Sequence, residues 1–75
     1  MPVPDADDPR SKFGGNLRSA RERAGLTQEA LGHVADLHPT EVNRIERGRR
    51  NPGLITIIRL ANALDIPASD LLAGL

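Results

Sequence analysis

Apolar residues recur every three or four positions along most of this chain, a spacing that places them on one face of an α-helix. The first group with this spacing consists of Phe13, Leu17, Ala20 and Ala24. Gly25 follows where a helix commonly ends, so we expect a first helix over residues 12–24. Within it, Gly14 and Gly15 are expected to weaken the first turn, because glycine is a poor helix former.

Four further segments are predicted to be helical, and residues that begin or end helices separate them. Thr27 can cap the N-terminus of the second helix, and Pro39 suits the first turn of the third. Pro52 precedes the fourth helix and Pro67 follows it. The apolar residues spaced along this helix are Leu54, Ile57, Ala61 and Leu64. The expected helices cover residues 28–35, 39–47, 54–64 and 68–73. Because no segment has a convincing strand pattern, the predicted fold class is all-α, a compact bundle of five helices.

Residues 28–47 have the pattern of two short helices that meet at a steep angle. Such helices need a small residue where their axes approach most closely, and Gly32 occupies that position. The apolar residues that would fill the angle are Leu31, Ala35, Leu37, Val42 and Ile45. The residues left on the outer face of the later helix are Thr40, Glu41, Asn43, Arg44 and Arg47. This arrangement is typical of a helix-turn-helix, whose later helix enters the major groove of DNA.

The N-terminal residues and the composition narrow the class of protein further. Residues 1–11 are rich in proline and aspartate, so we expect a disordered acidic tail there and the folded domain at residues 12–75. A chain of 75 residues builds one core, and it has no cysteine for a disulfide or a cysteine-based zinc site. No apolar run is long enough for a signal peptide or a membrane span, so we expect a cytoplasmic protein with no membrane partner.

The distribution of charge is more informative than its sum. Ten basic and ten acidic residues give a formal net charge of zero, which is unusual for a protein that binds nucleic acid. However, the first nine residues contain aspartates and no basic residue, whereas residues 44–50 contain four arginines and Glu46. A local basic surface of this kind could contact phosphates. Taken alone, the segment is equally consistent with a solvated, charged loop.

Three blocks of sequence together resemble one known family. They are LTQEAL at 26–31, IERGRRNP at 45–52 and LANAL at 60–64. From residue 13 to about residue 73, the chain is similar to the Cro/CI phage-repressor-like regulators, also called the XRE family. The resemblance implies a lambda-repressor-like fold, with the helix-turn-helix formed by the second and third helices. It also implies sequence-specific binding to double-stranded DNA and regulation of transcription.

The same resemblance assigns roles to residues of the third helix, the recognition helix. The positions that match base-reading residues are His38, Thr40, Glu41 and Arg44. Arg44 is the strongest candidate, because a guanidinium can bond guanine O6 and N7 together. Glu41 could accept a hydrogen bond from cytosine or, until it is paired, simply repel phosphate. The candidates for phosphate contact are Thr27, Gln28, Asn43, Arg47, Arg49, Arg50 and Asn51. Gln28 is also expected to brace the recognition helix.

The resemblance also concerns positions that hold the motif together. Arg21 and Glu46 match an ion pair that links the first helix to the end of the recognition helix; the alternative is that Arg21 is solvated. Asp36 stands where the turn usually has glycine, so slight strain or a shifted turn is expected there. His38 replaces a Ser or Thr, so a poorer helix cap is expected.

A homodimer is expected from the mechanism, because a single recognition helix reads only a few base pairs. A two-fold axis would place two such helices about 34 Å apart on a palindromic operator. The apolar residues that could form the dimer contact are Ile55, Ile58, Leu71, Leu72 and Leu75. The equally favoured alternative is that they complete a small core.

Catalysis is one alternative to DNA binding. The residues that could carry catalysis are His33, Asp36, His38 and Glu41. They match no nucleophile or metal arrangement, so we expect no enzyme, no metal and no other cofactor. The alternatives left open are a module that binds only proteins, an antitoxin with a toxin as partner, and a controller protein of a restriction–modification system. Residues 45–64 are similar to those small controllers. No pattern in the chain identifies the operator or the regulated genes.

Overall fold

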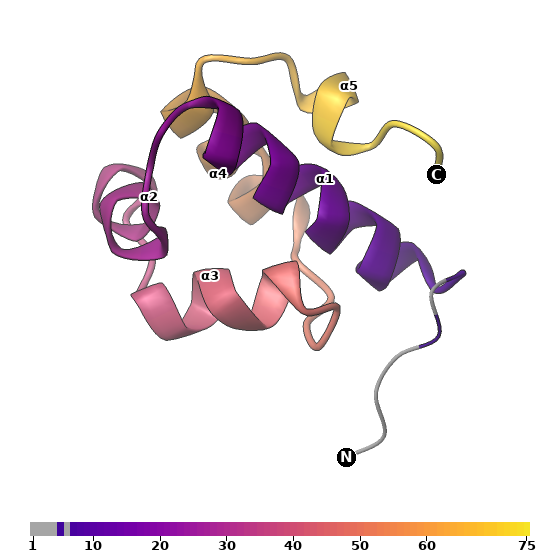
Figure 1. Ribbon diagram of the computed structural model, residues 1–75. Coiled ribbons are helices and arrows are strands. Elements are labelled where there is room, and N and C mark those ends of the chain that lie inside the picture. Colours follow the sequence, from indigo (N-terminus) through magenta and orange to yellow (C-terminus); the bar gives the residue numbers. More distant parts are fainter. Residues whose placement is uncertain (1–4, 6) are drawn as a thin grey trace.

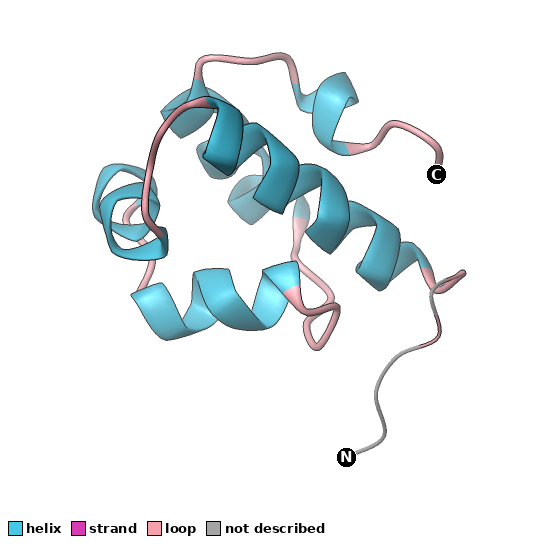
Figure 2. Ribbon diagram, viewed as in Figure 1, coloured by secondary structure: helices cyan, strands magenta, loops and turns pink. Residues whose placement is uncertain are grey.

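Five helices make up the computed structural model, which describes residue 5 and residues 7–75 (Figure 1). They are α1 (Pro9–Arg23), α2 (Gln28–Ala35), α3 (Pro39–Glu46), α4 (Leu54–Leu64) and α5 (Ala68–Leu71). Loops and turns join them, and no strand occurs within the described residues (Figure 2). The predicted all-α fold of five helices is therefore confirmed. None of the described helices has the length and apolar character that crossing a membrane requires.

α1 begins at Pro9 and not at residue 12, because Asp8 caps it. Asp8 Oδ1 accepts a hydrogen bond from the backbone N–H of Arg10 at 2.8 Å, and Pro9 fits the first turn. The Arg10 guanidinium also donates to the Asp8 carboxylate at 2.7 Å, and these bonds lower the pKa of Asp8 to about 2. Residues 9–11, which we expected in the tail, thus belong to the helix. The expectation of disorder at residues 1–4 and 6 lies outside the described residues.

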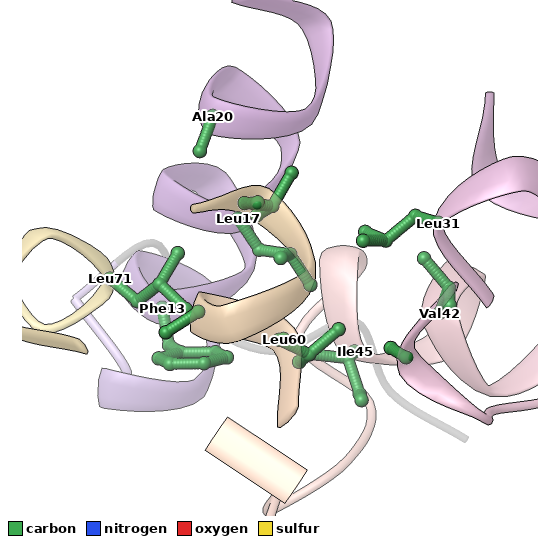
Figure 3. Close-up of a cluster of buried hydrophobic side chains, with 11 residues drawn as sticks. Phe13, Leu17, Ala20, Leu31, Val42, Ile45, Leu60 and Leu71 are labelled. Atoms are coloured by element: carbon green, nitrogen blue, oxygen red, sulfur yellow. The ribbon is translucent and has the colours of Figure 1, made fainter. Parts of the chain in front are cut away.

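The core draws buried side chains from all five helices. They are Phe13, Leu17, Ala20, Leu31, Ala35, Val42, Ile45, Leu60, Ala61, Leu64 and Leu71. Figure 3 shows Phe13 and Leu71 at one end of this cluster, and Leu31 with Val42 at the other. α3 packs on α1 and α2, while α5 packs on α1 and α4. Because burying one such Leu, Ile or Val contributes roughly 1.5–3 kcal/mol, this shared interior fixes how the helices are placed.

Leu71 belongs to the core, because its side chain is fully buried. Asn16 of α1 secures the same region by donating to the backbone carbonyls of Leu71 and Ala73 at 3.0 and 2.8 Å. The prediction that Leu71 takes part in a dimer contact is therefore wrong, since its side chain has no surface left for a partner. The other candidates for that contact are exposed: Ile55, Ile58, Leu72 and Leu75.

Two glycines let backbone segments approach more closely than a larger residue would permit. A Cβ on Gly14 would lie 2.5 Å from the carbonyl oxygens of Ile45 and Glu46, at the end of α3. A Cβ on Gly32 would lie 2.5 Å from the carbonyl oxygen of Leu37, in the turn between α2 and α3. Gly32 thus stands at the close approach expected for it. Gly14, expected only to weaken a turn, instead permits the contact between α1 and α3.

The turn between α2 and α3 passes through a left-handed residue. Asp36 has φ 59° and ψ 46°, and the backbone N–H groups of Asp36 and Leu37 both donate to the carbonyl of Gly32. This conformation is costly for an L-residue, although aspartate tolerates it better than most. The turn therefore carries the slight strain expected at Asp36 from the sequence.

Gly14→Ala should destabilise the protein, because the new methyl group would overlap two backbone carbonyls at the end of α3. Overpacking of this kind lowers the free energy of unfolding by about 1–3 kcal/mol. Gly15→Ala is the matched control, since a Cβ there meets nothing within 4 Å and should stabilise α1 by up to ~1 kcal/mol. Urea unfolding followed by circular dichroism measures both effects. Equal shifts in the two variants would show that the close approach does not constrain α1.

Candidate nucleic-acid interface

α3 has one face in the core and the opposite face in solvent. Val42 and Ile45 are fully buried, whereas Thr40, Arg44 and Arg47 are exposed. In Figure 1 the helix forms one edge of the molecule, with α1 and α2 on its inner side. A helix on an edge, with polar and basic side chains facing outward, has the shape and charge that a DNA major groove can receive.

His38 caps the N-terminus of this helix. Its Nδ1 accepts a hydrogen bond from the backbone N–H of Thr40 at 3.1 Å, and Pro39 fits the first turn. A ring nitrogen thus takes the place of the serine or threonine oxygen in this cap. With Nδ1 engaged in the cap, Nε2 is the ring nitrogen of this exposed side chain that is left for another partner.

A buried ion pair joins the end of α3 to α1. Arg21 donates to Glu46 through Nε at 2.6 Å and Nη2 at 3.0 Å, and through Nη1 to the Leu26 carbonyl at 2.8 Å. The Arg21 side chain is 13% exposed and that of Glu46 only 3%. The hydrogen bonds to Glu46 raise the pKa of Arg21 above its ordinary value, so the guanidinium stays charged despite its burial. Arg21 is therefore not a solvated arginine.

Gln28 connects this ion pair to the middle of α3. Its Nε2 donates to Glu46 Oε1 at 3.1 Å, and its Oε1 accepts from Asn43 Nδ2 at 3.4 Å. Thr27 caps α2 beside it, with Oγ1 accepting from the backbone N–H of Ala30 at 3.0 Å. Gln28 thus braces α3 from the start of α2. Asn43, expected on a phosphate, is half-buried and directs its amide at Gln28.

The loop after α3 carries further basic side chains. Arg49 and Arg50 line a recess of about 340 Å³ together with Asn43 and Arg44. Arg50 Nε donates to Glu41 Oε1 at 3.2 Å, so the acidic side chain on the outer part of α3 is paired within the protein. The loop arginines therefore gather beside the exposed face of α3, and they do so around a recess that lies open to solvent. Asn51, the remaining candidate from this loop, is exposed.

Comparison with known proteins agrees with this geometry. The family model described as helix-turn-helix matches residues 17–71. The chain belongs to the XRE-type helix-turn-helix family. It is thus a DNA-binding regulator of transcription, as the resemblance implied. Among the described residues, no group of three or more His, Cys, Asp or Glu side chains is placed to hold a metal ion.

Three proteins to which the chain is similar, two by sequence and one by structure, support this assignment. The chain is 39% identical over 74 residues to control protein C.SmaI from Serratia marcescens, covering 93% of this chain and 88% of the relative. It is 39% identical over 64 residues to control protein C.BamHI from Bacillus amyloliquefaciens, covering 84% and 79%. The crystal structure of the restriction–modification controller protein C.AhdI from Aeromonas hydrophila aligns with a TM-score of 0.81 and 44% identity, covering 83% of this chain and 94% of that one.

An exposed apolar surface outside the helix-turn-helix was only partly predicted. Leu54, assigned by its spacing to the inward stripe of α4, is 71% exposed because it stands in the first turn of the helix, ahead of the buried segment. It joins the exposed residues expected from the sequence, which are Ile55, Ile58, Leu72 and Leu75. A small hollow of about 140 Å³ lies near them, and its apolar walls include Phe13, Ile57, Leu72 and Leu75. The exposed apolar set therefore differs from the expected one by gaining Leu54 and losing Leu71.

Arg21→Met should strongly destabilise the protein, because it leaves the Glu46 carboxylate buried without a charged partner. Losing one partner of a buried pair costs about 3–5 kcal/mol in the free energy of unfolding, which approaches the whole stability of a small domain. Arg18→Met is the matched control in the same helix, since the pair of Arg18 with Glu22 is exposed and its loss costs at most about 1 kcal/mol. Chemical unfolding compares the two, and an Arg21→Met variant as stable as Arg18→Met would contradict the structural role of the pair.

Proposed function

We propose that this regulator binds a two-fold symmetric DNA site as a homodimer, with α3 of each protomer in the major groove. The observation that carries the proposal is the fixed orientation of α3. Val42, Ile45 and Glu46 anchor its inner side, and this leaves Thr40 and Arg44 facing solvent. Two such helices about 34 Å apart would meet successive major grooves on one side of the duplex.

Side chains at the start and in the middle of α3 would contact the bases. Arg44 is exposed and would bond guanine O6 and N7, a contact that discriminates against other bases by about 1–3 kcal/mol. Thr40 offers a hydroxyl, or a methyl group to thymine, and His38 offers its Nε2. Glu41 offers an acceptor for the N4 amino group of cytosine.

Phosphate contacts would come from both sides of α3. On one side lies the N-terminus of α2, where Thr27 and Gln28 stand at the positive end of a helix dipole. On the other side lies the loop after α3, which contributes Arg47, Arg49, Arg50 and Asn51, and Asn43 lies between the two. Such contacts position a protein on the duplex without reading its sequence. They place positive charge locally even though the net charge of the chain is zero.

The proposed dimer contact is the exposed apolar surface of α4 and the C-terminal residues. Its members are Leu54, Ile55, Ile58, Leu72 and Leu75. α4 and α5 pack against each other, so these residues come from neighbouring parts of the fold. Exposed large apolar side chains are typical of interfaces, and a core of this size gains stability from a second copy.

The genes under control are proposed to be those of a restriction–modification system. Support comes from the similarity, over most of each chain, to proteins named as control or controller proteins. The test is a reporter driven by the DNA upstream of the neighbouring genes, with and without this protein. Output that depends on the protein, next to genes for a methyltransferase and an endonuclease, supports the role. No effect at any neighbouring promoter would overturn it.

Arg44→Ala should abolish the preference at one guanine-containing position of the operator, because it removes the proposed base contact. Arg49→Ala is the control, since loss of a phosphate contact should weaken binding to all sequences alike. Selection of bound duplexes from a random pool, repeated with each variant, measures both outcomes. Unchanged preferences in Arg44→Ala would show that α3 does not read bases through this residue.

Ile58→Glu should weaken dimerisation by about tenfold or more, because it would place a carboxylate in an apolar contact. Val34→Glu adds the same charge at an exposed apolar position of α2, outside the proposed contact, and should leave the dimer intact. Sedimentation over a range of protein concentrations reports the change. If both substitutions weaken the dimer equally, or if neither weakens it, the interface lies elsewhere.

A further inference from the structure

The pair of Glu41 and Arg50 lies in the proposed DNA interface and joins two residues with opposite effects on DNA binding. Arg50 Nε donates to Glu41 Oε1 at 3.2 Å, and the side chains are 41% and 34% exposed, respectively. Glu41 belongs to the first turn of α3, and Arg50 belongs to the loop that follows the helix. A partly exposed pair of this kind adds little to folding stability, so a DNA phosphate can compete for the arginine.

The charge that Glu41 and Arg50 present to DNA depends on whether they are paired with each other. While they are paired, the charges of Arg50 and Glu41 offset each other, so the pair as a whole attracts a phosphate only weakly. When Arg50 moves to a phosphate, Glu41 becomes a bare carboxylate beside the DNA backbone, where like charges repel. That state becomes favourable only if a base donor, such as the N4 amino group of cytosine, bonds the carboxylate.

We propose that Glu41 retains Arg50 on non-cognate DNA and releases it to a phosphate only where Glu41 itself meets a base donor. This inference rests on the proposed placement of α3 in the major groove, and it adds a coupling between base readout and phosphate contact. The correct base then allows two contacts, its own bond to Glu41 and the contact of Arg50 with a phosphate. A wrong base allows neither. Discrimination at this position therefore exceeds what one hydrogen bond supplies.

The number of phosphates engaged can be read from the salt dependence of binding. Each neutralised phosphate contributes about 0.9 to the slope of log affinity against log salt concentration. The experiment measures this slope for a selected operator and for a random-sequence duplex, using the wild type, Glu41→Gln, Arg50→Ala and the double variant. Arg49→Ala serves as the control, because its guanidinium shares the recess but forms none of the ion pairs found within residues 5 and 7–75.

On the random duplex, Glu41→Gln should bind more tightly than the wild type, with a slope steeper by about 0.9 per protomer, because Arg50 is freed. In the Arg50→Ala background the same substitution relieves only the repulsion by the carboxylate and has no arginine to free, so it should steepen the slope by clearly less than in the wild type. On the operator, Arg50→Ala should reduce the slope by about 0.9 per protomer, whereas on random DNA it should not. Arg49→Ala should reduce the slope equally on both duplexes.

Two results would overturn the proposal. One is an effect of Glu41→Gln that persists unchanged in the Arg50→Ala background, which indicates simple repulsion by the carboxylate. The other is an equal loss of slope in Arg50→Ala on both duplexes, which indicates an ordinary phosphate contact. Failure of the wild type to select any sequence is a separate outcome and argues against the proposed function itself.

Discussion

The ion pair between Arg21 and Glu46 is the contact on which the position of α3 depends. Glu46 ends α3, and the two hydrogen bonds from the guanidinium fix that end against α1. Both charges have lost most of their hydration, so the pair is stable only while its geometry is maintained. Gln28 then carries the constraint along α3 by bonding both Glu46 and Asn43. One ionic contact thus sets the position of the exposed helix relative to two others.

This ion pair depends in turn on close backbone packing. Gly14 allows α1 to lie against the last carbonyls of α3, and Gly32 allows the turn to fold back on α2. Val42 and Ile45 fill the space beneath α3, so the helix cannot rotate without exposing them. The same packing holds the inner side of α3 rigid and leaves its outer side in solvent. A rigid helix with an exposed face suits a surface that reads DNA by shape and hydrogen bonding.

The helix-turn-helix could be predicted from the sequence because its determinants are local. The apolar spacing placed α2 and α4 at the boundaries the structure shows, and the family resemblance implied the pairing of Arg21 with Glu46. The start of α1 was missed, because the acidic residue that caps it stood in a stretch whose composition indicated disorder. The contact made by Gly14 was missed for another reason: it joins residues far apart in the chain, and helix propensity says nothing about such contacts.

The sequence by itself determined the helices, their order and the family, since apolar periodicity and the residues at helix ends act within a few positions. The tertiary structure alone decided which of two adjacent leucines is buried, because Leu71 meets α1 and α4 whereas Leu72 faces out. It also decided that Asn43 turns toward Gln28 and that Arg50 reaches Glu41. Those choices depend on the distances between elements once they are packed, and no spacing along the chain encodes such distances.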